Sequence, residues 1–121
     1  MQSPANAYAK VANQISGPRE LEASLLLDAA LRLRTVQKTW DGQNKGLDSA
    51  LHYNRKLWTF FLASVSDNEN PLPGDIRQNV INLGLFVCNH TMAILAAPNS
   101  ESLSSLININ RQLAAGLRSH G

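Results

Sequence analysis

The sequence predicts an all-α protein, a bundle of about five helices of which three are long and antiparallel. Leucine and alanine, which favour helices, number 32 among the 121 residues, whereas valine, isoleucine and threonine together number 15. Apolar residues make up 44% of the chain and recur at helical spacing between clusters of glycine, proline and asparagine. The length fits one domain, so residues 1–121 are expected to fold around a single core.

The first two expected helices both open on a residue suited to a helix start. Ser3 suits the N-cap because its oxygen accepts an unpaired N–H, and Pro4 suits the first helical position because it has no N–H to leave unpaired. Gly17 and Pro18 begin the second helix, and Glu20 stabilises the positive end of its dipole. The apolar stripe of this second helix, which ends before two closely spaced glycines, is Leu26, Ala29, Leu33, Val36 and Trp40.

Three further helices are expected at residues 47–65, at residues 73–97 and from Ser100 onward. The helix at residues 73–97 carries two apolar stripes, and a helix that is apolar on so many sides is normally central. Short connections favour antiparallel neighbours in an up-and-down bundle. The alternative is an extended helical hairpin that completes its core only with a partner. The two stripes are Ile76, Val80, Leu83, Val87, His90 and Ile94, and Ile81, Leu85, Cys88, Met92 and Leu95.

Composition excludes several classes of protein. Cys88 is the single cysteine, so the chain has no internal disulfide and no cysteine-built zinc site. The net charge is only +2 and the basic residues are scattered, unlike the basic face of most nucleic-acid-binding proteins. No run approaches the roughly 18 uninterrupted apolar residues of a membrane span, and no signal peptide opens the chain. We therefore expect a soluble helical protein in a reducing compartment.

Pairs of chemically active residues do not converge on a catalytic or metal site. Cys88 and His90 are two positions apart on an expected helix, so their side chains diverge by about 200°. Asp48 and His52 are four apart and share a face, but two ligands without a third do not make a metal site. No phosphate-binding or nucleophile motif is present. We expect no enzymatic activity, no cofactor and no metal.

A small basic group and two polar residues leave alternatives open. The group of Arg32, Arg34 and Lys38 does not form one stripe, and it is either a solvated face or a weak RNA phosphate contact. Asn54 and Asn110 interrupt apolar stripes. Each either faces water or a neighbouring helix end at the bundle edge, or fixes the register of packing at some expense of stability.

Three aromatic residues within four positions are the most informative feature. Trp58, Phe60 and Phe61 cannot all point at one core, because successive helical residues differ by 100°. At least one should lie on another face. If that residue is exposed, it indicates a binding surface; the alternative is that neighbouring helices cover it.

Taken in order, several segments resemble the FlaF family of flagellar biosynthesis regulators from alphaproteobacteria. The resemblance covers roughly residues 4–117, and its specificity comes from the order and spacing of the pieces. The pieces are Asn6-Ala7-Tyr8, Pro18-Arg19-Glu20-Leu21-Glu22-Ala23, Asn54-Arg55-Lys56-Leu57-Trp58-Thr59-Phe60, Pro71-Leu72-Pro73, Ile76-Arg77 and Asn82-Leu83-Gly84-Leu85-Phe86-Val87.

The resemblance implies a cytoplasmic, non-enzymatic protein that binds flagellin as a secretion chaperone and acts opposite the FlbT regulator of flagellin messenger. We expect helix-in-groove binding to a terminal helix of flagellin. The expected binding face consists of Tyr8, Leu51, Arg55, Trp58 and Leu62, so Trp58→Ala should weaken the complex more than it lowers thermal stability. The alternative function is an RNA-binding or FlbT-associated post-transcriptional regulator of flagellin messenger.

Overall fold

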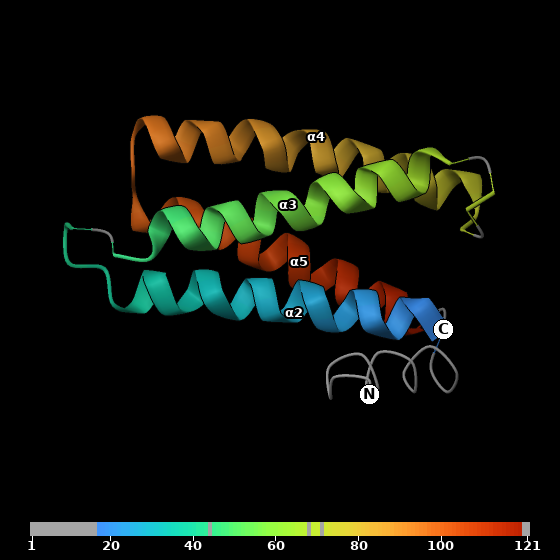
Figure 1. Ribbon diagram of the computed structural model, residues 1–121, viewed down its shortest axis with the longest axis horizontal. Coiled ribbons are helices and arrows are strands. Elements are labelled where there is room, and N and C mark those ends of the chain that lie inside the picture. Colours follow the sequence, from blue (N-terminus) through green and yellow to red (C-terminus); the bar gives the residue numbers. More distant parts are fainter. Residues whose placement is uncertain (1–16, 44, 68, 71, 120–121) are drawn as a thin grey trace, which may run out of the picture.

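The computed structural model describes residues 17–43, 45–67, 69–70 and 72–119, and these residues form four α-helices, one short 3₁₀ turn and no strand (Figure 1). The all-α prediction is therefore confirmed. The helix expected from Ser3 lies outside the described residues. The elements are α2 (Gly17–Lys38), α3 (Leu47–Ser66), α4 (Gly74–Ala96), η1 (Ser100–Ser102) and α5 (Leu103–Ser119).

The helices pack as two pairs, and one side of the arrangement is open. The chain reverses between consecutive helices, with the α2–α3 and α4–α5 loops at one end and the α3–α4 loop at the other (Figure 1). The most extensive contacts join α2 to α5 and α3 to α4, whereas α2 contacts α3 less and α4 barely contacts α5. Figure 1 shows α5 diverging from α4 as it leaves the loop that connects them.

The core lies between the faces that the apolar stripes of α2, α3 and α5 predict. Burial of these side chains supplies most of the stabilisation, at roughly 25 cal/mol per Å² of apolar area. An exposed ion pair between Glu20 and Arg118 (2.8 Å) joins the start of α2 to the end of α5 and adds little. The largest fully buried apolar side chains are Trp58, Leu26, Leu33, Leu51, Ile94, Leu103, Leu106 and Val87.

The prediction that the helix at residues 73–97 is central was wrong. Only one side of α4 is buried, through Val80, Gly84, Val87, Thr91 and Ile94, and this side packs on α3. Of the second stripe, Leu85, Met92 and Leu95 are exposed, whereas Ile81 is partly buried against the core and Cys88 is half-buried. Apolar periodicity shows which residues share a face of a helix, but it does not show which other helix, if any, packs on that face.

Gly84 sets the close approach of α4 to α3. A Cβ built at this position would lie 2.8 Å from Leu62 Cγ and 2.5 Å from Leu62 Cδ2, too close for a real contact. We expect Gly84→Ala to lower the free energy of unfolding by about 1–2 kcal/mol, because overpacking outweighs the gain in helix propensity. Chemical denaturation followed by circular dichroism measures this change.

Gly116 of α5 provides the matched control for this substitution. It is also helical, but a Cβ at this position has nothing within 4 Å. Gly116→Ala should therefore raise the free energy of unfolding by about 0.5–1 kcal/mol, through helix propensity alone. Equal effects of the two substitutions would contradict the close packing at Gly84.

Candidate functional site

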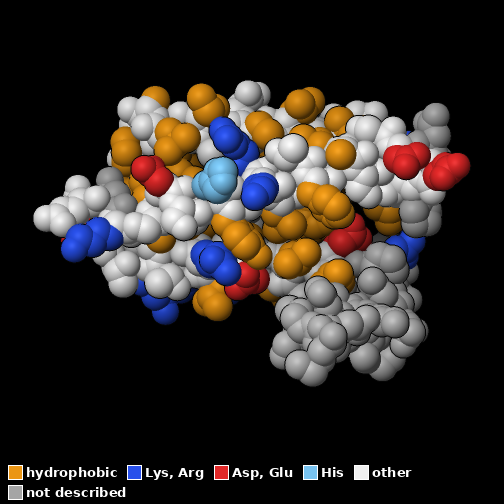
Figure 2. Space-filling model, viewed as in Figure 1, with side chains coloured by type: hydrophobic (Ala, Val, Ile, Leu, Met, Phe, Trp, Pro, Cys, Tyr) orange, Lys and Arg blue, Asp and Glu red, His pale blue; other side chains and the backbone are white. Residues whose placement is uncertain are grey.

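The outer side of α4 presents large apolar side chains to solvent. Leu85, Phe86, Met92 and Leu95 are 43–59% exposed. No Asp, Glu, Lys or Arg occurs from Gln78 to Ser100, so no charge interrupts this surface. Figure 2 shows hydrophobic side chains along the edge of the molecule that α4 forms. Contiguous exposed apolar residues are typical of a surface that binds another molecule.

A groove with a volume of about 270 Å³ lies between α4 and α5 at the end where these helices diverge. At the other end, His90 Nε2–H donates to the Ser102 carbonyl (2.8 Å) and holds α4 to η1. The groove has apolar walls, with Asn79 and Gln112 as its polar residues. Lining residues recur at helical spacing in both walls: Ile76, Val80 and Leu83 of α4, and Ile109, Leu113 and Gly116 of α5.

Other helices cover much of the binding face expected on α3. Leu51 and Trp58 are 1% and 0% exposed, so they belong to the core and are not free to contact a partner in this conformation. Leu62 is half-buried beside Gly84, and Arg55 is exposed. Leu51 and Arg55 do line one hollow, which they share with Leu95 of α4. The fifth residue, Tyr8, lies outside the described part of the chain.

A chain of hydrogen bonds links Trp58 to the two asparagines inside the core. Trp58 Nε1–H donates to Asn110 Oδ1 (2.9 Å), and Asn110 Nδ2 donates to Asn54 Oδ1 (2.7 Å). Both asparagines are 0% exposed, so neither faces water at the bundle edge. Among the described residues, Asn54 Nδ2 has no partner. The bonds join α3 to α5 and favour one register of these helices.

The three clustered aromatic residues divide between core and surface. The Trp58 and Phe61 rings are buried edge to face, with centroids 5.8 Å apart. Phe60 is 59% exposed, and its ring centroid lies 6.0 Å from that of Phe61. The prediction that at least one of the three lies on another face is therefore confirmed, and Phe60 is that residue.

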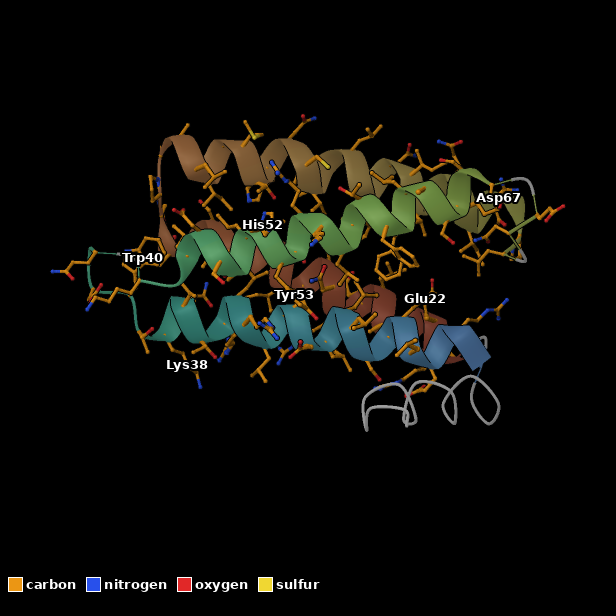
Figure 3. The ribbon with its side chains drawn as sticks, viewed as in Figure 1. Glu22, Lys38, Trp40, His52, Tyr53 and Asp67 are labelled. Carbon is orange, nitrogen blue, oxygen red and sulfur yellow. The ribbon has the colours of Figure 1, made fainter. Side chains whose placement is uncertain are left out.

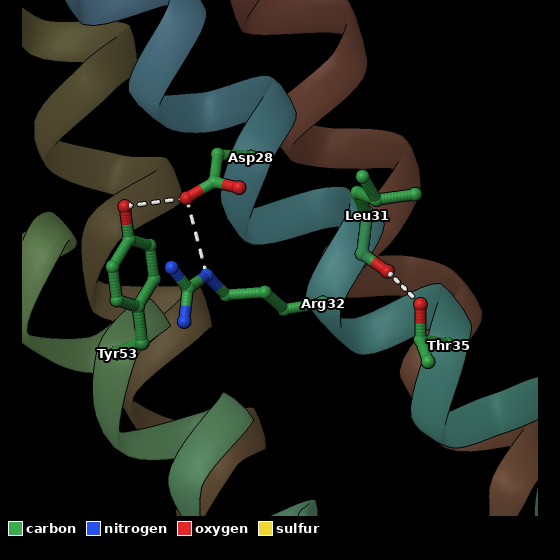
Figure 4. Close-up of polar contacts among 5 residues, drawn as sticks. All are labelled: Asp28, Leu31, Arg32, Thr35 and Tyr53. Carbon is green, nitrogen blue, oxygen red and sulfur yellow. Dashed lines mark hydrogen bonds and ion pairs between the residues drawn. The ribbon is translucent and has the colours of Figure 1, made fainter.

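The predicted basic group is split by its contacts. Arg32 Nε–H donates to Asp28 Oδ2 (3.1 Å), and its guanidinium lies 4.1 Å from the Tyr53 ring centroid. Tyr53 donates its hydroxyl to the same Asp28 oxygen (2.9 Å; Figure 4). Arg32 is thus engaged in joining α2 to α3. Arg34 and Lys38 instead line an exposed hollow together with Arg111 of α5. The apolar residues of this hollow are Leu27, Ala30 and Leu31.

Glu22, Lys38 and Asp67 lie apart from one another (Figure 3). Within the described ranges, no three His, Cys, Asp or Glu side chains are close enough to hold a metal ion. Burial raises the pKa of Glu22 above its usual value, and the charge of Arg19 partly offsets this. Burial, together with the hydrogen bond to Asp28, raises the pKa of Tyr53. Glu22 lies on α2 and Tyr53 on α3, and they do not form an acid–base pair with each other in Figure 3.

By length and composition, α4 is the one helix in the described part of the chain that could cross a membrane. Only 28% of its apolar stretch is buried in the protein. The sequence criterion, an uninterrupted apolar run, passed over this helix because polar residues such as Asn82, Asn89 and His90 interrupt it. Core helices of soluble proteins meet the same length and composition test, so this observation is weak evidence for a membrane span.

The described residues form a small all-α protein with an uncovered apolar groove, a structure typical of proteins that bind other chains. The family model of flagellar protein FlaF matches residues 4–117, and the chain belongs to the FlaF family. This match confirms the resemblance seen in the sequence. No curated protein and no solved structure matched the chain.

Proposed function

We propose that the protein binds flagellin in the cytoplasm as a secretion chaperone, and thereby promotes flagellin synthesis and export. The observation that carries the proposal is the apolar, uncharged groove between α4 and α5, in a chain that belongs to a flagellar family. A surface without charge suits the apolar stripe of an amphipathic helix. The proposal assigns no reaction to the protein.

Flagellin needs such a partner because its terminal helices pack against other subunits only in the assembled filament. The terminal helices of flagellin bury their apolar stripes when subunits assemble, so a free subunit exposes them and aggregates early. A small helical protein that covers one stripe prevents this. Because the bound helix must become ordered, part of the interaction energy is lost and the affinity stays moderate, which permits release at the export gate.

Mixing the purified full chain with monomeric flagellin tests the proposal. We expect a one-to-one complex on size exclusion, and flagellin without its terminal helices should not co-elute. The affinity should change little with salt, because none of the residues that line the groove between α4 and α5 is charged. Failure to co-elute at every salt concentration would overturn the proposal.

The alternative function, an RNA-binding or FlbT-associated regulator of flagellin messenger, makes the opposite salt prediction. Its structural support is the group of Arg34, Lys38 and Arg111, which have no ion-pair partner among the described residues. Three cations are few for an RNA-binding surface. Tight binding to flagellin messenger that falls steeply with salt would favour this alternative over the chaperone.

A further inference from the structure

We infer that the groove between α4 and α5 is the seat for one amphipathic helix of the partner, with its apolar and uncharged stripe turned into the groove. This inference rests on the proposed function and names the site at which flagellin's terminal helix binds. The occupant is therefore a helix of flagellin. The dimensions of the groove and its lack of charge determine which side of that helix can bind there.

The two walls of the groove match the dimensions of a helix. Ile76 and Leu83 mark the α4 wall, and Ile109 and Gly116 mark the α5 wall. Seven residues separate the members of each pair, which corresponds to about 10 Å or two helical turns. A third helix lying between two diverging helices can place side chains from successive turns between their ridges. The groove therefore fits about two turns of a partner helix.

The lining defines the chemistry of the helix that fits. None of the lining residues is charged, and the floor includes the buried Val80 and Leu117. A charged side chain pressed into this groove would lose its hydration without gaining a partner, which is costly. Asn79 is exposed and Gln112 is exposed, so their amides are available to polar positions at the edge of the bound helix. The occupant is accordingly an aliphatic stripe flanked by uncharged polar residues.

Gly116 is the observation that separates a binding groove from a packing defect. A glycine inside a helix costs about 1 kcal/mol relative to alanine, so it calls for a reason. Gly84 has an internal reason, because Leu62 fills the space where its Cβ would lie. Gly116 has none within the described residues: it lies in the groove wall, and a Cβ there would contact nothing within 4 Å. A missing side chain at this point lets the backbone of another helix come close.

The outer stripe of α4, marked by Leu85 and Met92, is a weaker seat for the same helix. It lies on one helix only, so a partner placed there contacts one wall and buries less of its own stripe. The groove contacts a partner from two sides. Binding energy concentrates where a side chain enters a well-packed, desolvated pocket.

Titration of the full chain with monomeric flagellin tests the inference through three single substitutions. Gly116→Trp fills the groove and should weaken binding by about tenfold or more, since it removes the pocket that anchors the helix. Ala115→Trp is the matched control, because it places the same side chain at an exposed position of α5 that does not line the groove, and it should bind within about threefold of the unchanged chain. Met92→Gln alters the outer stripe and should bind like the control.

The outcomes separate the inference from the proposed function. Absence of binding by the unchanged chain overturns both. Binding by the unchanged chain together with equal binding by Gly116→Trp overturns the groove and leaves the chaperone proposal standing. Selective loss with Met92→Gln also overturns the groove, in favour of the outer stripe. A dimer that Gly116→Trp converts to a monomer, with flagellin binding unchanged, assigns the groove to a second copy of the chain and again overturns the inference.

A second variant keeps the test decisive if the tryptophan disturbs folding, which circular dichroism reveals. Gln112→Glu changes one lining amide into a carboxylate of the same shape, at an exposed position. It should weaken flagellin binding by about threefold to tenfold at low salt, since the charge must be partly desolvated in the complex. Unchanged binding by a folded Gln112→Glu chain would count against the groove.

Discussion

Trp58→Ala should lower the free energy of unfolding by about 3–5 kcal/mol, the largest effect we expect from any single substitution in this chain. The Trp58 side chain is fully buried, and its ring packs edge to face on Phe61. Its removal leaves a large cavity, and Asn110 Oδ1 loses the N–H donor from Trp58. Urea denaturation followed by circular dichroism measures the loss.

Trp58→Phe is the control that separates the hydrogen bond from the volume. Phenylalanine retains most of the apolar contact but has no N–H, so Asn110 Oδ1 is left without that donor. We expect a loss of about 1–3 kcal/mol, clearly smaller than that of Trp58→Ala. If Trp58→Ala preserved stability but abolished flagellin binding, Trp58 would be a surface residue and the face expected from the sequence would be restored.

The sequence located α3 and its apolar stripe, but it did not reveal what covers that stripe. Helical spacing correctly grouped Leu51, Trp58 and Leu62 on one side, because the 3.6-residue period fixes which side chains share a face. The interpretation of that side as a binding face was an additional step. In the structure α4 packs on Leu62, at a distance that Gly84 makes possible, whereas Trp58 bonds to Asn110 of α5. Which helix fills a stripe depends on tertiary packing, and local periodicity contains no information about it.

The groove between α4 and α5 could not be predicted from the sequence either. Its walls come from residues 76–83 and 109–116, which are about thirty positions apart in the chain. Helical spacing placed Ile76, Val80 and Leu83 on one apolar stripe but assigned no role to Ile109 or Gly116. The one available signal was the double stripe of the helix at residues 73–97, which exceeds what a single neighbour can bury. The double stripe predicts a central helix, whereas among the described residues α4 packs mainly on α3.

For Asn54 and Asn110 the sequence left two alternatives open, a position at the edge of the bundle or a role in fixing the register of packing. The structure supports the second, because both side chains are buried. Asn54 and Asn110 are 56 positions apart, and nothing in either local sequence indicates that they bond to each other. The hydrogen bonds from Trp58 through Asn110 to Asn54 hold one relative position of α3 and α5. An apolar pair would tolerate a shift of one helix along the other, but a shift here would leave several buried polar groups unpaired.

Asn110→Ala should therefore lower the free energy of unfolding by about 2–5 kcal/mol, because two buried partners lose their hydrogen bonds at once. Asn110 accepts from Trp58 and donates to Asn54, so its removal affects both neighbours. Asn54→Ala removes only one of these bonds and also eliminates the unpaired Nδ2, so it should be less destabilising. Denaturation of both variants under one set of conditions gives the comparison.

A greater loss of stability from Asn110→Ala than from Asn54→Ala would identify Asn110 as the middle member of the hydrogen-bond network.

Combining Trp58→Phe with Asn110→Leu removes the donor and the acceptor together and places apolar groups on both sides. Each single variant leaves one member of the bond between Trp58 and Asn110 buried without its partner, whereas the double variant removes both members. The double variant should therefore lose less stability than the sum of its single variants. Strict additivity, or a greater loss from Asn54→Ala than from Asn110→Ala, would mean that the chain of bonds does not act as a unit.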